Sequence, residues 1–431
     1  MPLGPPTQRR RWRIAALLGI GVLVNYFDRV NLSVSFESLS KEFGLSTIAF
    51  GYLLSAYSWS YALCQIPSGA LLDRLGVKLV GRISTLLWSI ASFAAAVSTG
   101  VAQFFTSRLL LGVGEAPTFP ANAKAVGYWF PQQERSFATA CFDAAAKFAN
   151  AIGVPLIGLL LLHVGWRWSF AATGFVSLAY ALLFFVLYRD PADDTKLSVE
   201  EFDYIRAGAA QKEGTDSRAS LEFLITRRKV LGLAIGSAAY NYCFYLLLTW
   251  LPGYLSISLH LDLLHSVLYT SVPWLVATVT DLLIGGYMVD ELIRRGYDAS
   301  TVRRTVLIGG TSLGVAIFAA GAATTPAAAV FWISVSLGGL AAAAPVGWSI
   351  PTLIAPRGSV GRVGGIMNFA SQLAAISAPI ITGYVVASTK SFAGAFMLAA
   401  IFLVIGIAAY AFLLGRIEPI ETASTRVVSL V

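Results

Sequence analysis

Four ionisable residues stand inside two long apolar segments of the chain. The first segment contains Asp28 and Arg29 within Asn25-Tyr-Phe-Asp28-Arg29, and the fourth contains Arg108 and Glu115. A charged side chain at the centre of an isolated spanning helix costs about 2.5–3.5 kcal/mol, so such residues should face a cavity or a partner. Burial disfavours the charged form of a carboxyl group, and a neighbouring guanidinium favours it. Two carboxyl and two guanidinium groups could therefore exchange a proton and bind an organic anion.

The spacing of these residues allows them to meet. Asp28 lies roughly 21 Å along the axis of its predicted helix, and Arg108 and Glu115 are two helical turns apart on one face. We expect Arg29 and Arg108 to attract the anion, and Asp28 and Glu115 to carry the coupling proton. The alternative is a network of ion pairs that only holds the helices together.

Further ionisable residues occur in other apolar segments. Asp143 and Lys147 are four residues apart, a spacing at which they can pair on one helix face. Lys147 is therefore either a cationic contact for the anion or half of a structural pair. We assign no role to Asp281 of the eighth segment.

The composition indicates which elements must position these residues. The chain has 431 residues, of which 56% are hydrophobic and 13% charged, and its mean hydropathy is +0.70. Soluble domains carry about 25% charged residues, so a water-soluble globule is excluded and a polytopic membrane protein is predicted. The net charge of +8 is typical of basic cytoplasmic loops, and we expect no nucleic-acid partner.

Twelve continuous apolar segments are long enough to cross a bilayer, which needs roughly 20 residues per helix. Continuous rather than alternating apolar runs exclude strands and predict an all-α membrane protein. Lys and Arg concentrate in the loops on one side, which places both termini in the cytoplasm. The predicted spans are residues 14–36, 50–72, 79–98, 101–123, 136–162, 167–188, 230–256, 265–289, 304–321, 327–353, 361–388 and 391–415.

A polar stretch divides these segments into six plus six. Its part from Ser198 to Gln211 can form an amphipathic surface helix. We predict a six-helix bundle over residues 1–188, a cytoplasmic central loop over residues 189–229 and a second six-helix bundle over residues 230–431.

The loop after the second segment carries a motif that is partly repeated after the eighth. It reads Gly69-x-x-x-Asp73-Arg74-x-Gly76-x-Lys78. Recurrence at a six-segment offset indicates duplicated bundles. The motif resembles the signature between the second and third helices of the major facilitator superfamily. The resemblance implies two bundles that rock around a midplane site, with Asp73 favouring the outward-open state. It also implies that Arg74 and Lys78 contact helix ends or lipid headgroups, unless they are ordinary cytoplasmic charges.

The first and fourth segments are similar to those of the anion:cation symporter family of this superfamily. The similarity rests on Asn25-Tyr-Phe-Asp28-Arg29 and on Arg108-Leu-Leu-Leu-Gly-Val-Gly-Glu115. That family includes bacterial proton-coupled importers of D-galactonate, hexuronates and glucarate, and animal sialic acid and vesicular glutamate transporters. The resemblance implies proton sites at Asp28 and Glu115, and substrate binding or coupling at Arg29 and Arg108. Further implied or candidate contacts are Tyr26, Tyr61, Trp348 and Asn368.

Two features bear on the substrate. The fifth-segment glutamine of galactonate-type members is replaced by Ala146, which removes an amide that recognises hydroxyl groups and puts galactonate itself in doubt. The seventh segment carries Tyr240, Asn241 and Tyr245. Tyrosine side chains can bond sugar hydroxyls or stack on an aromatic acid, or they can simply pack between helices.

These observations predict a proton-coupled importer of an organic anion that works by alternating access, with an aldonate or uronate as the first expectation. The alternatives are an aromatic or dicarboxylic acid as substrate, an anion exchanger, and a receptor that binds an anion without moving it. The proton is the expected coupling ion, with no other cofactor. The scattered cysteines Cys64, Cys141 and Cys243 indicate no metal site. We expect a lipid-embedded monomer of the bacterial inner membrane, and not an enzyme.

Overall fold

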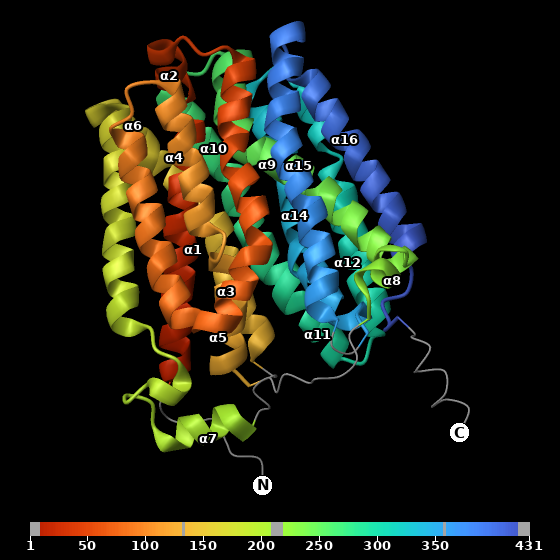
Figure 1. Cartoon of the computed structure of the whole chain (residues 1–431). Helices are drawn as coiled ribbons and strands as arrows, with labels where there is room; N and C mark the ends of the chain where they lie inside the picture. Colours follow the sequence, from red (N-terminus) through yellow and green to blue (C-terminus); the bar gives the residue numbers. More distant parts are fainter. Residues whose placement is uncertain (1–8, 132–133, 208–218, 357–358, 421–431) are drawn as a thin grey trace. The chain divides into compact units, whose positions relative to one another are not determined.

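The computed structural model describes residues 9–131, 134–207, 219–356 and 359–420 (Figure 1). These residues form helices and connecting turns, and no strand occurs among them. Within the described chain, nine helices are long and apolar enough to cross a membrane. The predicted all-α membrane architecture is confirmed, and each of the twelve predicted segments is helical over most of its length.

Contacts divide the chain into two compact units. Unit 1 comprises Met1–Lys212 with Leu261–Ser271, and unit 2 comprises Glu213–His260 with Val272–Val431. The helices that begin in unit 1 are α1 (Arg10–Val34), α2 (Phe36–Phe43), α3 (Thr47–Ala96), α4 (Val101–Glu115), α5 (Thr118–Trp129), α6 (Arg135–Leu187), α7 (Val199–Ala207) and α10 (Leu263–Thr280). Those of unit 2 are α8 (Leu221–Ile225), α9 (Arg228–Leu259), α11 (Val289–Arg294), α12 (Ala299–Gly314), α13 (Ile317–Gly321), α14 (Pro326–Ile354), α15 (Val360–Thr389) and α16 (Ala393–Ala408). Two π-helical segments, Asp281–Met288 and Ala409–Leu414, continue α10 and α16.

Two of the long helices each contain two predicted spans. The backbone of α3 turns at Gly76, where φ is +74°, and that of α6 turns at Gly165, where φ is +78°. Glycine adopts these angles without the steric cost of a Cβ atom. Gly76, a residue of the loop motif, thus joins the second span to the third.

The fourth span is interrupted between α4 and α5. Glu115 is the last residue of α4, and Pro117 precedes α5. Proline lacks the backbone N–H that would continue the helical hydrogen bonds. The interruption places Glu115 at a helix end inside the fourth span.

Unit 1 holds α4 closely against both halves of α3 (Figure 1). A Cβ atom on Gly112 would collide with Ser60 and with the carbonyl of Tyr57, and one on Gly114 would lie 2.8 Å from the backbone nitrogen of Trp88. These two glycines therefore set the depth at which α4, and with it Glu115, enters the helix packing.

The start of α1 is anchored to the central loop. Arg11 Nη1 lies 2.8 Å from Glu201 Oε1 of α7, and Arg11 Nε lies 2.7 Å from Glu134 Oε2, just before α6. The Tyr204 hydroxyl also donates to Glu134, at 3.0 Å. The predicted amphipathic helix is thus present as α7, and ion pairing binds it to the start of α1 within unit 1. Residues 208–211 of that prediction lie outside the described chain.

Candidate functional site

Arg29 of α1 and Glu115 of α4 form an ion pair inside unit 1. Arg29 Nε donates to Glu115 Oε2 at 2.9 Å, and the two side chains are 7% and 0% exposed. Removal of one partner of a buried pair leaves an uncompensated charge, which costs about 3–5 kcal/mol. Any process that neutralises Glu115 or offers Arg29 another anion therefore acts on a strong interaction.

Three tyrosine rings surround the Arg29 guanidinium. Its central carbon lies 4.5 Å from the ring centre of Tyr26, 4.6 Å from that of Tyr57 and 5.4 Å from that of Tyr61. Cation–π contacts of this kind contribute about 0.5–2 kcal/mol each. Tyr26 and Tyr61 are candidates from the sequence. Tyr57 was not identified there, although it precedes Tyr61 by four residues and so shares its helix face.

Arg108 is buried in unit 1, and two of its guanidinium nitrogens make no hydrogen bond to the described residues. Its Nη1 donates to the backbone carbonyl of Asp28 at 3.1 Å, while Nε and Nη2 have no hydrogen-bond partner among the described residues. The guanidinium packs against the rings of Phe104 and Phe170, and it interacts electrostatically with Asp28 and Glu115. Nε and Nη2 together form the fork that binds a carboxylate in bidentate fashion.

Asp28 is bonded to hydroxyl groups rather than to a guanidinium. Ser92 Oγ of α3 donates to Asp28 Oδ1 and Ser177 Oγ of α6 donates to Asp28 Oδ2, both at 2.7 Å. The carboxyl group is fully buried. All four ionisable residues of the first and fourth spans thus lie in unit 1, with one direct ion pair among them. Neither serine was identified from the sequence.

The fifth span contains the expected intrahelical pair. Lys147 Nζ donates to Asp143 Oδ2 at 2.6 Å, and both side chains are largely buried. The lysine is thus engaged with a carboxylate of its own helix in this structure. A role for Lys147 as a substrate contact stays a prediction.

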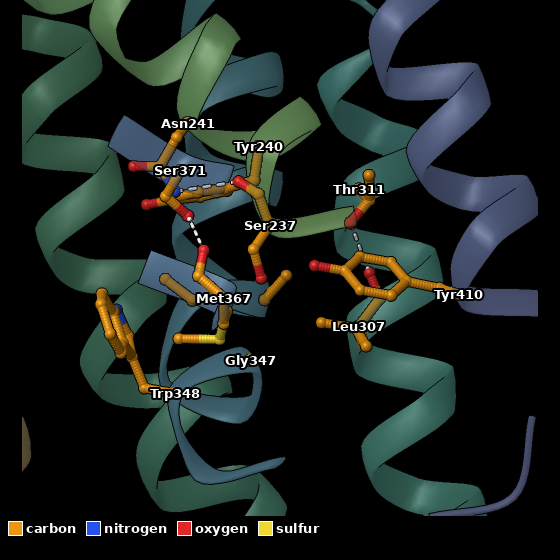
Figure 2. A pocket seen from close by; sticks show the side chains of 12 residues that line it. Ser237, Tyr240, Asn241, Leu307, Thr311, Gly347, Trp348, Met367, Ser371 and Tyr410 are labelled. Atoms are coloured by element: carbon orange, nitrogen blue, oxygen red, sulfur yellow. Dashed lines mark hydrogen bonds between the residues drawn. The ribbon is translucent and has the colours of Figure 1, made fainter. Parts of the chain in front are cut away.

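Unit 2 contains a small, mostly apolar cavity with several polar groups in its lining (Figure 2). It encloses about 30 Å³ of water-accessible space, room for about two water molecules. The lining residues include hydroxyl and amide groups and no charged side chain. They are Ser237, Tyr240, Asn241, Leu307, Thr311, Ala343, Ala344, Gly347, Trp348, Met367, Ser371 and Tyr410.

Three of the residues predicted in the second half of the chain line this cavity, namely Tyr240, Asn241 and Trp348. Two others do not belong to its lining. Asn368 stands between the lining residues Met367 and Ser371 of α15 but is not itself part of the lining. Tyr245 is buried beside Phe244.

Three of the polar lining groups, those of Asn241, Thr311 and Ser371, donate to carbonyls of their own helices. Figure 2 shows Thr311 Oγ1 donating to the carbonyl of Leu307 at 2.7 Å, and Ser371 Oγ donating to that of Met367 at 3.0 Å. Sequence reasoning missed Thr311, Ser371 and Tyr410. Hydroxyl residues are frequent in apolar spans, and their types alone do not reveal which of them share a cavity.

The loop motif is described in part. Arg74 is exposed. A Cβ atom at position 69 would lie in open space, so close packing does not require Gly69. Lys78 Nζ lies 3.6 Å from Asp193 Oδ2 of the central loop, so Lys78 contacts a loop carboxylate in this structure. The side chain of Asp73 lies outside the described part of the chain.

Comparison with known proteins assigns the chain to a family. Residues 18–297 match the Major Facilitator Superfamily. The chain is 38% identical over 415 residues to the uncharacterized transporter YybO of Bacillus subtilis, with 95% of each chain covered. It is 31% identical over 419 residues to the D-galactonate transporter of Escherichia coli O6:H1, with 95% of this chain and 97% of that protein covered. A probable galactarate/D-glucarate transporter of Escherichia coli K12 is 32% identical, with 95% of this chain and 96% of that protein covered.

Solved structures show the same fold. A bacterial homolog of the human lysosomal transporter Spinster, inward-facing and unoccupied, matches with a TM-score of 0.75 at 16% identity, over 95% of this chain and 98% of that one. A D-xylose-proton symporter matches with a TM-score of 0.71 at 17% identity, with the same coverage. The resemblance found in the sequence is thereby confirmed. The chain belongs to the Major Facilitator Superfamily, as a multi-pass transporter of the bacterial inner membrane and not an enzyme.

Proposed function

We propose that the protein imports a sugar acid together with a proton by alternating access. The observation that carries this proposal is the buried Arg29–Glu115 ion pair, with Arg108 beside it retaining unused donors. A carboxyl group that alternates between the charged and neutral forms can bind and release Arg29. Proton binding and anion binding then act on the same guanidinium.

The proposed cycle begins with protonation of Glu115. The neutral carboxyl group no longer holds Arg29 by charge, and the substrate carboxylate takes the guanidinium in its place. Arg108 contributes its Nε and Nη2 donors to the same anion. Loss of the proton on the inner side restores the Arg29–Glu115 pair and expels the substrate. The bound anion can drive the conformational change only through its different affinities for the two states, and here that difference is electrostatic.

A polyhydroxylated acid is supported over an aromatic acid by two observations. Relatives that align over nearly the whole chain are named as transporters of D-galactonate and of galactarate or D-glucarate. The lining of the unit 2 cavity includes hydroxyl and amide groups, among them those of Ser237, Asn241 and Ser371, which suit hydroxyl recognition.

Uptake into proteoliposomes tests the proposal. Purified protein is reconstituted, and accumulation of radiolabelled D-galactonate, D-glucarate and an aromatic acid, phthalate, is followed with and without a more acidic exterior. We expect a sugar acid to accumulate above its external concentration only with the gradient. Uptake that ignores the gradient but accelerates with internal substrate would establish an exchanger instead. Saturable binding without accumulation would establish a receptor.

A further inference from the structure

Asp28 is the one ionisable residue of the first and fourth spans whose carboxylate is bonded only to hydroxyl groups among its described partners. The two serines that donate to it come from different spans, Ser92 from the second half of α3 and Ser177 from the second half of α6. Both serine side chains are completely buried. The hydroxyl of Thr173, also on α6, donates instead to the carbonyl of Phe170, at 3.1 Å. Asp28 thus connects the first, third and sixth spans.

Ser92 has two acceptors within reach, whereas Ser177 donates to Asp28 alone among the described residues. Ser92 Oγ lies 2.7 Å from Asp28 Oδ1 and 3.2 Å from the carbonyl oxygen of Trp88, one turn earlier in its own helix. A hydroxyl group has a single proton to donate, so Ser92 donates either to Asp28 or to Trp88. In this structure it lies closer to the carboxylate.

Charged and titratable groups lie near this site on the first, second, fourth and sixth spans. Arg108 and Glu115 interact electrostatically with Asp28, whereas the hydroxyl groups contact it directly. The other described groups are Arg29, which pairs with Glu115, Tyr57, which interacts with Arg108, and Tyr180, which stacks on Trp88.

We propose that Ser92 and Ser177 are positioning residues for proton coupling, which stabilise the charged form of Asp28 against the effect of burial and convey its protonation to the third and sixth spans. This inference rests on the proposed function, in which Asp28 exchanges a proton. When Asp28 gains a proton, its new O–H donates to the oxygen of Ser92, and the Ser92 proton turns to the carbonyl of Trp88. Every donor still has an acceptor. The hydrogen bond between α3 and α1 now runs from Asp28 to Ser92 instead of from Ser92 to Asp28. A change of charge in the first span thereby alters packing within unit 1.

Infrared titration of the purified protein tests this inference without any transport step. The band of the protonated Asp28 carboxyl group is identified by its loss in Asp28→Asn, and its intensity is followed against pH. Ser92→Ala and Ser177→Ala should each move the titration midpoint to higher pH by about one unit, a tenfold change in proton affinity, because a carboxylate that loses a donor holds its proton more tightly. Ser177→Thr, which keeps the hydroxyl group, should restore the midpoint.

Ser89→Ala is the matched control. Ser89 lies on the same helix and is also buried, but its hydroxyl donates to the carbonyl of Thr85. Its removal should leave the Asp28 band and midpoint unchanged. Equal midpoints in wild type, Ser92→Ala and Ser177→Ala would overturn the inference, as would a shift in Ser89→Ala of the same size. Failure of gradient-driven uptake in the wild type would contradict the proposed function, and the titration would still decide the roles of the serines.

Discussion

The ionisable cluster of unit 1 and the cavity of unit 2 hold their polar groups in different ways. In unit 1 the polar bonds cross between helices, from Arg29 to Glu115 and from Ser92 and Ser177 to Asp28. In the cavity of unit 2, Thr311 and Ser371 bond to carbonyls of their own helices. Bonds between helices make packing depend on charge, so a proton or an anion can alter the packing. Bonds within a helix satisfy a hydroxyl group without linking helices, and the group stays available to accept a bond from a ligand.

Arg29→Ala should have the largest effect, because it leaves Glu115 buried without its ion-pair partner. We expect a loss of about 3–5 kcal/mol in stability and at least a hundredfold weaker binding of D-galactonate, measured by thermal unfolding and calorimetry. The double variant Arg29→Ala with Glu115→Gln is the matched control. It should regain much of the stability and none of the affinity. Unchanged affinity in Arg29→Ala would assign this arginine to structure alone.

Lys147→Gln should have an intermediate effect on the choice among acids. We expect the ratio of affinities for D-glucarate and D-galactonate to change by roughly tenfold, the equivalent of about 1.4 kcal/mol, with folding retained. Asp143→Asn, which removes the intrahelical partner of Lys147, is the companion variant. Equal ratios in both variants and wild type, together with poor yields of folded protein, would show that the pair is structural.

Removal of a single hydroxyl from unit 2 should have a smaller effect. Ser371→Ala and Thr311→Val should weaken sugar-acid binding three- to tenfold, because each removes one neutral hydrogen bond worth about 1 kcal/mol. The pH dependence of uptake should stay as in wild type. Ser377→Ala, on α15 and bonded to the carbonyl of Ala374, is the control. A shifted pH profile in Ser371→Ala would break the contrast between the units.

Glu134→Gln should have the smallest effect and should not touch transport at neutral pH. Burial alone would raise the pKa of Glu134, but the hydrogen bonds from Arg11 and Tyr204 outweigh it and hold that pKa below its usual value. The resulting stability is present at neutral pH and is lost as the pH falls through the lowered pKa. Because the site is partly exposed, the variant should lose at most about 1 kcal/mol at neutral pH. The difference in melting temperature from wild type should vanish in acid.

A loss of proton-driven uptake by Glu134→Gln at neutral pH would contradict this assignment of Glu134 to stability alone. Tyr204→Phe is a milder variant of the same cluster, since it removes one donor to Glu134 and keeps the ring. It should shift the acid limb of the unfolding curve in the same direction, by a smaller amount.

The helices were largely predictable because each span is a continuous apolar run with polar ends. The predicted spans also bracket the two bends, because the backbone leaves the helical conformation at Gly76, between residues 72 and 79, and at Gly165, between residues 162 and 167. What the pattern did not reveal is that the fourth span divides between Glu115 and Thr118. A proline inside an apolar span does not by itself mark a helix end.

The charged part of the candidate site was predictable because charges inside apolar spans are rare. Its uncharged part was not. Serine is common in such spans, so the type of Ser92 or Ser177 does not distinguish a ligand of Asp28 from a side chain bonded to its own helix, such as Ser89. Asn368 shows a related difficulty, because it stands between the lining residues Met367 and Ser371 without being part of the lining itself.

The most direct test of the account is the number of protons taken up when the anion binds. Purified protein in weakly buffered solution is mixed with D-galactonate or D-glucarate at near-neutral pH, and a pH-sensitive dye reports proton uptake per anion bound. If substrate replaces Glu115 at Arg29, wild-type protein takes up protons on binding, and Glu115→Gln takes up about one fewer per anion. Equal proton uptake by wild type and Glu115→Gln would contradict the claim that proton and anion meet at this ion pair.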